Sequence, residues 1–240
     1  MKIYLLTSNK YTKNICPINV HFLNKYWPNQ NITIVGYEDV LELKNLPNNV
    51  SIECLGTQED YGATWTNALI PFFKQIEEEY FVLIFDDHIL MNNVDESKIY
   101  ELEKYLINKK AQKAMIGGGI DLRYATKFQQ DQNVLVFDQY VDYRTSLHPA
   151  IWTKDYFLRY LKPNMTSWDF EIRNHNKSRG DGANILNYNY SYPDEPHLFS
   201  YLELYTKGTL NLKDAVVQTE QKSRKFFNDE DLKYIWERTK

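Results

Sequence analysis

Two carboxylates and an imidazole stand side by side at the end of an apolar run. Residues 80–85 read YFVLIF, and Asp86, Asp87 and His88 follow directly. Two adjacent carboxylates repel each other unless water or a cation offsets their charge. Mg²⁺ and Mn²⁺ take oxygen ligands and commonly bridge a carboxylate to phosphate groups, and we expect Mn²⁺ to accept the imidazole better than Mg²⁺. The three residues therefore predict either a divalent-cation site or a solvated turn between a strand and a loop.

The elements around this trio indicate an α/β fold. YFVLIF is typical of a strand buried on both faces of a sheet. Hydrophobic patterns predict a strand that runs into a polar turn at 3–9 and further strands at 32–37, 50–55, 114–120 and 134–137. They predict helices at 16–27, 63–79 and 95–110. This alternation predicts a mostly parallel, doubly wound sheet flanked by helices, and ligands bind such sheets at the carboxyl ends of the strands. The second half should add loops and short helices, with an amphipathic closing helix in 221–240.

Composition narrows the class of protein. The 240 residues are 43% hydrophobic and 25% charged, which is enough for one large domain, and the net charge is −4. Without a basic excess, nucleic acid is a poor candidate partner. No apolar run approaches the length of a transmembrane segment. The two cysteines form no CxxC motif, so we expect a reducing, cytoplasmic location.

Three stretches resemble one enzyme family in the expected order. YGATWTNALIPFFKQIEEEYFVLIFDDHIL (61–90) looks like the core of GT-A-type glycosyltransferases, in which a helix leads into a strand that ends in a DxD-like motif. SLHPAIWTKDYFLRYLKPNMTSWDFEIR (146–173) resembles the acceptor side of bacterial and viral polysaccharide glycosyltransferases, and YLELYTKGTLN (201–211) is similar to a stretch near their end. The chain departs from the family at His88, where the motif has a carboxylate, and this puts metal dependence in doubt.

The resemblance implies a fold and an activity. It implies a single GT-A-like domain over 1–240, with a nucleotide-sugar-binding half (1–120) and an acceptor-binding half with the closing helix (121–240). It implies transfer of a sugar from a nucleotide-diphosphate donor, a UDP- or GDP-sugar, to a hydroxyl of a glycan or sugar acceptor in polysaccharide biosynthesis. Mn²⁺ or Mg²⁺ would be the cofactor, and an inverting reaction is expected.

Donor-binding roles follow from the same resemblance. Residues after the strands of the first half would bind the nucleotide, with Asp86 and Asp87 facing the ribose and the metal-bridged diphosphate in an order that adjacency does not fix. A basic residue near the end would neutralise the leaving diphosphate. These candidates are Thr7, Ser8, Asn9, Asp60, Tyr61, Asp86 and Lys207. The alternative to donor binding is a structural role. The candidates at strand ends would then form polar turns, and Lys207 would lie in a solvated surface turn.

The metal, acceptor and catalytic roles fall on residues further along the chain. The predicted metal ligands are Asp87, His88 and His197. The predicted acceptor contacts are His148 and Trp168, either of which would otherwise be a structural residue.

An inverting transfer needs a carboxylate that accepts the acceptor's proton, and SWDFE (167–171) supplies the candidates Glu171 and Asp169. TSWD also has the pattern of a helix N-terminus. In that case Asp169 caps the helix and Glu171 is left for chemistry.

Two other functions stay open at this point. A metal-dependent nucleotidyltransferase would also use strand-end acids, but it should carry a Gly-, Lys- or Arg-rich loop after the first strand, where TSNKYTKN has no glycine. A non-catalytic carbohydrate-binding protein of the same fold would retain the aromatic residues of the second half and lack the chemistry.

Overall fold

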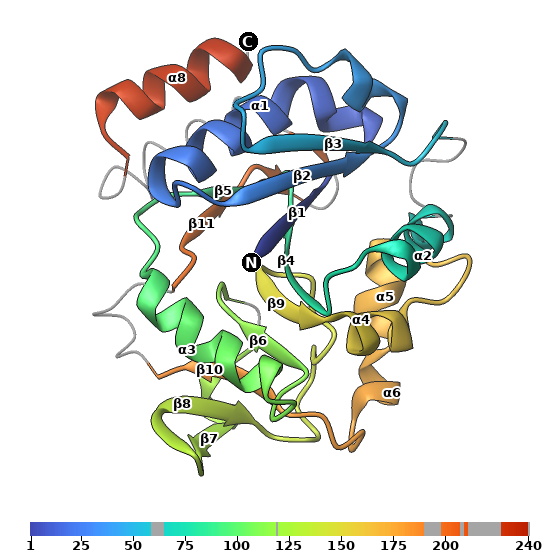
Figure 1. Ribbon diagram of the computed structural model, residues 1–240, viewed down its shortest axis with the longest axis vertical. Coiled ribbons are helices and arrows are strands. Elements are labelled where there is room, and N and C mark those ends of the chain that lie inside the picture. Colours follow the sequence, from blue (N-terminus) through green and yellow to red (C-terminus); the bar gives the residue numbers. More distant parts are fainter. Residues whose placement is uncertain (59–64, 119, 190–197, 207–208, 211–226, 240) are drawn as a thin grey trace.

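The fold is built on one nine-stranded sheet (Figure 1). The structure is a computed structural model, and it describes residues 1–58, 65–118, 120–189, 198–206, 209–210 and 227–239. The strand order is β3-β2-β1-β4-β9-β6-β10-β8-β7, and two small two-stranded sheets, β11-β5 and β12-β13, accompany it.

The strands are β1 Lys2–Leu6, β2 Asn31–Gly36, β3 Val50–Cys54, β4 Tyr80–Phe85, β5 His88–Leu90, β6 Lys113–Met115, β7 Ala125–Phe128, β8 Asp131–Phe137, β9 Ala150–Thr153, β10 Ile185–Tyr188, β11 Tyr201–Glu203, β12 Tyr205–Thr206 and β13 Thr209–Leu210. The helices are α1 Asn9–Tyr26, α2 Trp65–Gln75, α3 Glu96–Ile107, α4 Lys154–Tyr160, α5 Ser167–Arg173, α6 His175–Ser178 and α8 Asp229–Thr239, with short 3-10 turns η1 Glu38–Glu42 and η2 Leu122–Tyr124.

The sheet confirms the predicted mostly parallel α/β architecture. The first-half strands β3, β2, β1 and β4 are parallel neighbours, and β6 and β10 form a further parallel pair. Strand β9 runs antiparallel between β4 and β6, with Leu83 opposite Ala150 and Tyr80 opposite Thr153. A strand from the second half of the chain, β9, is therefore inserted between two strands from the first half, β4 and β6.

Alternating side chains of the central strands supply both apolar layers of the core. Ile3 and Leu5 of β1 face α1 and α3, in a cluster that includes Cys16 and Leu102. Successive strand residues point to opposite faces. Tyr4 and Leu6 accordingly join the other layer, under α2, α4 and α5, with Phe73, Phe157 and Phe170. Both faces of β1 and β4 are covered, as the apolar run at 80–85 predicts (Figure 1).

Several predicted boundaries were wrong. The helix predicted at 16–27 begins at Asn9, directly after the polar turn that follows β1, and the strand predicted at 114–120 is β6 Lys113–Met115. Pro17 therefore lies inside this helix and not in its first turn. The second half is also more regular than predicted, because 150–173 folds into β9, α4 and α5.

The C-terminal helix packs on the body of the protein. Asp231 of α8 accepts hydrogen bonds from Lys25 and, at 2.8 Å, from the Tyr26 hydroxyl, both of them in α1. The buried side chain of Ile235 lies in a cluster with Phe22 of α1. This packing confirms the predicted closing helix.

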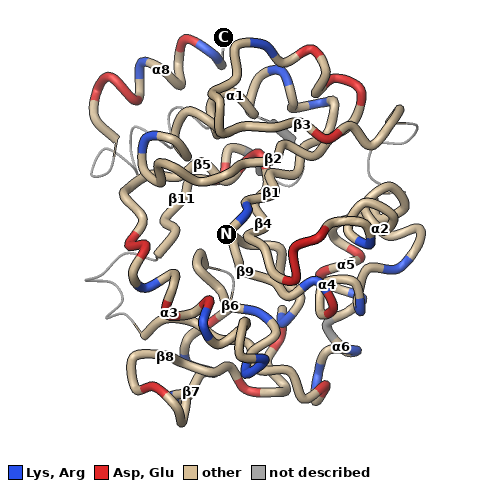
Figure 2. Tube along the Cα trace, viewed as in Figure 1, with Lys and Arg blue, Asp and Glu red and all other residues tan. Residues whose placement is uncertain are grey.

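Charges are interspersed along the trace, with acidic and basic segments alternating around the outside in the view shown (Figure 2). Within the described parts of the chain, no helix has both the length and the apolar character needed to cross a bilayer.

Candidate functional site

A pocket of about 480 Å³ opens at the carboxyl ends of β1 and β4. Its walls come from the β1–α1 turn, the ends of β2 and β3, α2, the turn after β4, and the start of α5. The lining residues are Leu6, Thr7, Ser8, Lys10, Tyr11, Val35, Tyr37, Leu55, Gln58, Trp65, Leu69, Phe85, Asp86, Asp87, Thr166, Ser167 and Trp168. The predicted donor residues Thr7, Ser8 and Asp86 therefore share one concave site with Trp168 of the acceptor half.

Asp86 is fixed at the floor of this pocket. The Thr7 hydroxyl donates to its Oδ2 at 2.5 Å, and its backbone N–H donates to the Leu6 carbonyl at 3.0 Å. Its side chain is buried, and burial together with the charge of Asp87 raises the pKa of its carboxyl. Asp86 thus presents a desolvated carboxyl that a hydroxyl donor or a cation would stabilise.

Asn9 has a different role from Thr7 and Ser8. Its backbone N–H donates to the side chain of Gln58 at 2.9 Å, and its side-chain oxygen accepts the Asp39 N–H at 3.1 Å. Asn9 is not among the lining residues of the pocket. It ties the start of α1 to the segments after β2 and β3 and so supports the pocket wall.

The turn that carries the two carboxylates is held from behind by Asn19. The Nδ2 of this buried α1 residue donates to the carbonyl oxygens of Phe85, Asp86 and His88 at 3.2, 3.1 and 3.0 Å. A turn at a strand end leaves carbonyls without ladder partners, and buried carbonyls need donors. Asn19 thus fixes the backbone from which Asp86, Asp87 and His88 project.

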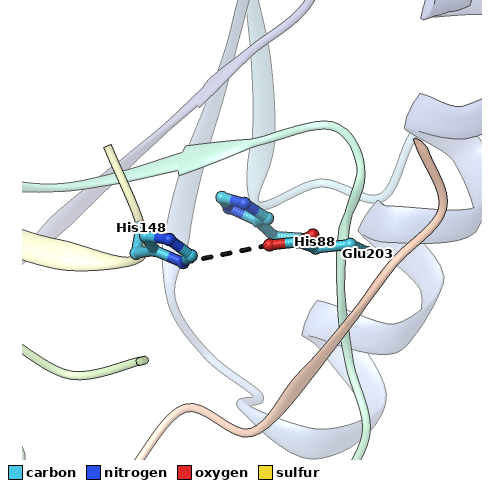
Figure 3. A group of neighbouring side chains, drawn as sticks. All are labelled: His88, His148 and Glu203. Carbon is cyan, nitrogen blue, oxygen red and sulfur yellow. Dashed lines mark ion pairs between the residues drawn. The ribbon is translucent and has the colours of Figure 1, made fainter. Parts of the chain in front are cut away.

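His88 belongs to a group with His148 and Glu203 (Figure 3). Strand β5 begins with His88 and pairs antiparallel with β11, in the register that sets Glu203 opposite His88. The two imidazole rings stack with centroids 6.0 Å apart and planes 6° from parallel. One ligand atom from each of the three residues lies within 4.8 Å of the others. The Oδ1 of Asp87 lies 3.8 Å from the Nε2 of His88, so a fourth donor adjoins the group.

The electrostatics of this group favour a cation. Burial lowers the pKa of His88 to about 3, so its imidazole is neutral near pH 7 and has a lone pair to donate. Burial raises the pKa of the Asp87 and Glu203 carboxyls, and the charge of Asp87 adds to the shift at Glu203. The neutral imidazole of His88 and the ring of His148, beside two destabilised carboxylates, form a donor set that a divalent ion would stabilise.

Glu171 lies in α5 with its carboxyl turned inward. Its Oε1 accepts the Leu147 N–H at 2.6 Å. Burial raises the pKa of this carboxyl, with smaller contributions in the same direction from the charges of Glu203 and Asp87. A buried carboxylate with a raised pKa, close to other reactive groups, has the properties of a general base.

Asp169 serves the helix, as the structural alternative predicted. It forms a capping box with Thr166: the Asp169 N–H donates to the Thr166 hydroxyl, and the Thr166 N–H donates to Asp169 Oδ2, each at 3.0 Å. Its other oxygen pairs with Arg173 Nε at 2.7 Å. Both carboxylate oxygens are therefore engaged, which leaves Glu171 as the base candidate of this segment.

The remaining predicted residues divide into three groups. Trp168 is 60% exposed and lines the pocket. His148, predicted as an acceptor contact, lies in the imidazole–carboxylate group, and its Nδ1 is hydrogen-bonded to the Tyr201 hydroxyl. Four predicted site residues lie outside the described residues: Asp60, Tyr61, His197 and Lys207.

Sequence reasoning missed Glu203 and Asn19. Glu203 falls within the third resembling stretch, but only the β5–β11 register reveals that it faces His88. Asn19 is a polar residue on the buried face of an amphipathic helix, so the sequence could have indicated that it has a buried hydrogen-bond partner. The sequence could not have shown which residues that partner comprises.

Comparisons with known proteins identify the fold. No family model matches the sequence, and no curated protein matches it. A cytidylyltransferase from Leptospira borgpetersenii is 12% identical with a TM-score of 0.51, over 98% of this chain and 91% of that one. Residues 1–349 of S. aureus TarS are 11% identical with a TM-score of 0.50, over 82% of this chain and 58% of that one. The chain spans about half (52%) of a third match, the bifunctional IspDF from Campylobacter jejuni, at 14% identity, a TM-score of 0.45 and 83% of this chain.

At these identities the likeness concerns the fold alone. The two matches with TM-scores of 0.50 and 0.51 support the GT-A-like, nucleotidyltransferase-like fold that the sequence implies. Because a cytidylyltransferase and TarS share this fold, the fold alone assigns no reaction to this chain.

Proposed function

We propose that this protein is a metal-assisted glycosyltransferase that moves a sugar from a nucleoside-diphosphate donor to a hydroxyl of a glycan or sugar acceptor. The observation that carries the proposal is the buried carboxylate of Glu171, held by the Leu147 N–H close to the group formed by His88, His148 and Glu203. A base and a cation site at one edge of a sheet are what an inverting transfer from a diphosphate needs.

The pocket supports binding of the donor's nucleoside. Trp65 stacks on Phe85 with ring centroids 5.9 Å apart, and Tyr37 also lines the pocket, so aromatic walls are available to a base. Thr7 and Asp86 supply the polar groups for a ribose. The first turn of α1 has no acidic residue and carries Lys10, an arrangement that suits a diphosphate at the helix N-terminus.

The metal assignment follows from the donor set. Asp87, His88, His148 and Glu203 would hold the ion, and two imidazoles favour Mn²⁺ over Mg²⁺, which prefers oxygen ligands and water. When bound, a divalent ion neutralises the charge that develops on the departing diphosphate. The replacement of the family's carboxylate by His88 is then compensated by Glu203, which faces it across the β5–β11 pair.

Glu171 would act on the acceptor. One carboxylate oxygen is held by Leu147, which leaves the other to accept a hydrogen bond from the acceptor hydroxyl. As the hydroxyl oxygen attacks the anomeric carbon, its proton passes to Glu171 and the nucleoside diphosphate leaves from the opposite face, with inversion. Trp168 at the rim would pack against the apolar face of a sugar ring.

One observation weighs against nucleotidyl transfer. The β1–α1 connection consists of Thr7 and Ser8 alone, with no room for a Gly- and Lys-rich loop around a triphosphate. Among the described residues that line the pocket, Lys10 is the one cation, beside the carboxylates of Asp86 and Asp87. One lysine beside two carboxylates suits a diphosphate with a bound divalent ion better than the more negative triphosphate.

The test separates the two reactions by their products. A thermal-shift screen with UDP, GDP, CDP and dTDP, each with and without Mn²⁺, identifies the nucleotide, because a ligand of the native state raises apparent stability. The matching nucleotide sugars and nucleoside triphosphates are then supplied with a panel of acceptors. Glycosyl transfer releases a nucleoside diphosphate, whereas nucleotidyl transfer releases pyrophosphate. Pyrophosphate release would overturn the proposal, and binding of sugars without any nucleotide-induced shift would indicate a carbohydrate-binding protein.

A further inference from the structure

Lys113 is a fully buried lysine in the sheet, at the start of β6. A buried ammonium group is costly unless the protein supplies partners. Its Nζ donates to the carbonyl oxygens of Ser146 at 2.6 Å and Arg144 at 3.2 Å, and it lies 4.0 Å from the ring centroid of Trp152. Within the described residues, no carboxylate forms an ion pair with Lys113. Its nearest electrostatic partners are therefore a pair of peptide carbonyls and an aromatic face.

The peptide that accepts from Lys113 is the same peptide that holds Glu171. The Ser146 carbonyl receives the lysine, and the N–H of the next residue, Leu147, donates to Glu171 Oε1 at 2.6 Å. In a planar trans peptide the C=O and N–H point to opposite sides. One peptide unit thus stands between the ammonium group and the carboxylate, with its N–H end toward the carboxylate.

The positive charge of Lys113 and the hydrogen bond of the peptide N–H act on Glu171 in the same direction. A donor on the carbonyl polarises the peptide and strengthens the hydrogen bond that its N–H gives. The lysine charge and the Leu147 N–H both favour the ionised form of Glu171, against burial and the negative charges of Glu203 and Asp87. Burial holds the pKa of Lys113 well below its usual value, and the charge of Glu171 acts to raise it.

We infer that Lys113 is a positioning residue for Glu171, which it orients and keeps ionised through the Ser146–Leu147 peptide. The catalytic meaning of this contact rests on the proposed function, in which Glu171 is the base. The contact itself does not, because the ionisation of Glu171 can be followed without any substrate.

The experiment measures the pKa of Glu171 by carbon NMR on metal-free protein with ¹³C-labelled glutamate side chains, the signal being assigned with Glu171→Gln. In Lys113→Met the pKa of Glu171 should rise by about one unit or more, the size expected from loss of a nearby opposite charge. In Lys113→Gln, which keeps a donor and loses the charge, the rise should be smaller. Lys154→Met is the matched control, since Lys154 Nζ also donates to a backbone carbonyl, that of Ile76, at 3.0 Å. It should leave the pKa of Glu171 unchanged.

A reciprocal measurement covers the case in which the Lys113 variants do not fold. Coupling between two sites is mutual, so the near-isosteric Glu171→Gln should lower the pKa of Lys113, read from its ¹³Cε signal, by a similar amount. An unchanged Glu171 pKa in folded Lys113→Met, or an unchanged Lys113 pKa in Glu171→Gln, would overturn the inference. If the two pKa values are coupled but Glu171→Gln still transfers sugar, the contact stands and the proposed base is wrong.

Discussion

Asn19 of α1 binds the backbone of Asp86, with its Nδ2 3.1 Å from the Asp86 carbonyl oxygen. The same nitrogen also reaches the carbonyls of Phe85 and His88, so one amide group fixes the whole turn between β4 and β5. The turn carries Asp86 and Asp87, the two acids among the described residues that line the pocket, and its geometry depends on a residue that belongs to neither strand.

Asn19→Ala should therefore damage both stability and binding. Loss of donors to buried carbonyls costs about 1–3 kcal/mol of unfolding free energy. Nucleotide binding in the presence of Mn²⁺ should weaken as the turn loosens, measured by calorimetric titration beside chemical denaturation. Asn24→Ala is the control, because the Asn24 side chain donates to the Val20 carbonyl of its own helix and accepts from Asn49, and neither bond involves the turn. Equal nucleotide affinity in Asn19→Ala and Asn24→Ala would contradict the positioning role of Asn19.

Glu171→Gln should remove transfer while leaving donor binding intact. General-base catalysis contributes about 10²- to 10⁴-fold to rate. The loss should therefore appear in kcat, with nucleotide affinity unchanged in a titration. Asp169→Asn, two residues away, should weaken the α5 cap and lower the melting temperature, yet retain turnover. Near-normal turnover in Glu171→Gln would exclude this residue as the base.

Glu203→Gln should weaken the response to Mn²⁺ more than Glu237→Gln, a control in α8 that pairs with Lys233 and is not a member of the group. Removal of one ligand from a four-donor set lowers ion affinity, and we expect a fall of about tenfold or more by analogy with losses around metal sites. Direct titration of the protein with Mn²⁺, before and after chelation, gives the affinity. Asp87→Asn should show the same defect together with weaker nucleotide binding. A Glu203→Gln protein that binds Mn²⁺ normally would remove Glu203 from the ligand set.

His88 should make metal-free protein sensitive to acid. Its folded pKa of about 3 lies below the ordinary value of 6.5, so the unfolded chain binds the proton more tightly. Its contribution is present above about pH 6.5 and is lost as pH falls toward 3. The raised pKa values of Asp86 and Asp87 act with the opposite sign over the range in which they titrate, since the folded state holds those protons more tightly. Melting temperatures of wild type and His88→Asn should therefore diverge less at pH 4 than at pH 7, and a constant difference would refute the neutral-histidine assignment.

The local sequence pattern was enough to predict the strand and the two carboxylates of the first half of the candidate site. The run at 80–85 is a strand with these bounds, because six apolar residues ending in two carboxylates leave little choice of boundary. The capping alternative at Asp169 also followed from the spacing of Thr166 and Asp169, since a capping box needs only residues three apart.

What the sequence did not reveal depends on long-range register. Glu203 lies opposite His88 only because β5 and β11 pair as they do, across more than a hundred residues. Lys113 lies opposite Trp152 because β6 and β9 are neighbours in the sheet, and its Nζ bonds the Ser146 carbonyl in the segment before β9. No local periodicity encodes that neighbourhood. The early start of α1 was missed because its first turn is polar and the apolar stripe begins only further along.

The reversal of β9 has an evolutionary consequence. Because it runs antiparallel to β4, it begins at the edge of the sheet where β4 ends, and the segment before it, 146–149, arrives beside the turn at Asp86. Under the proposed function, this segment brings His148 to the reaction centre from the second half of the chain. Mutation there would change which hydroxyl is presented, while the pocket between β1, β2 and β4 would keep its nucleotide. New glycan linkages would then arise in such a scaffold without the donor site having to be rebuilt.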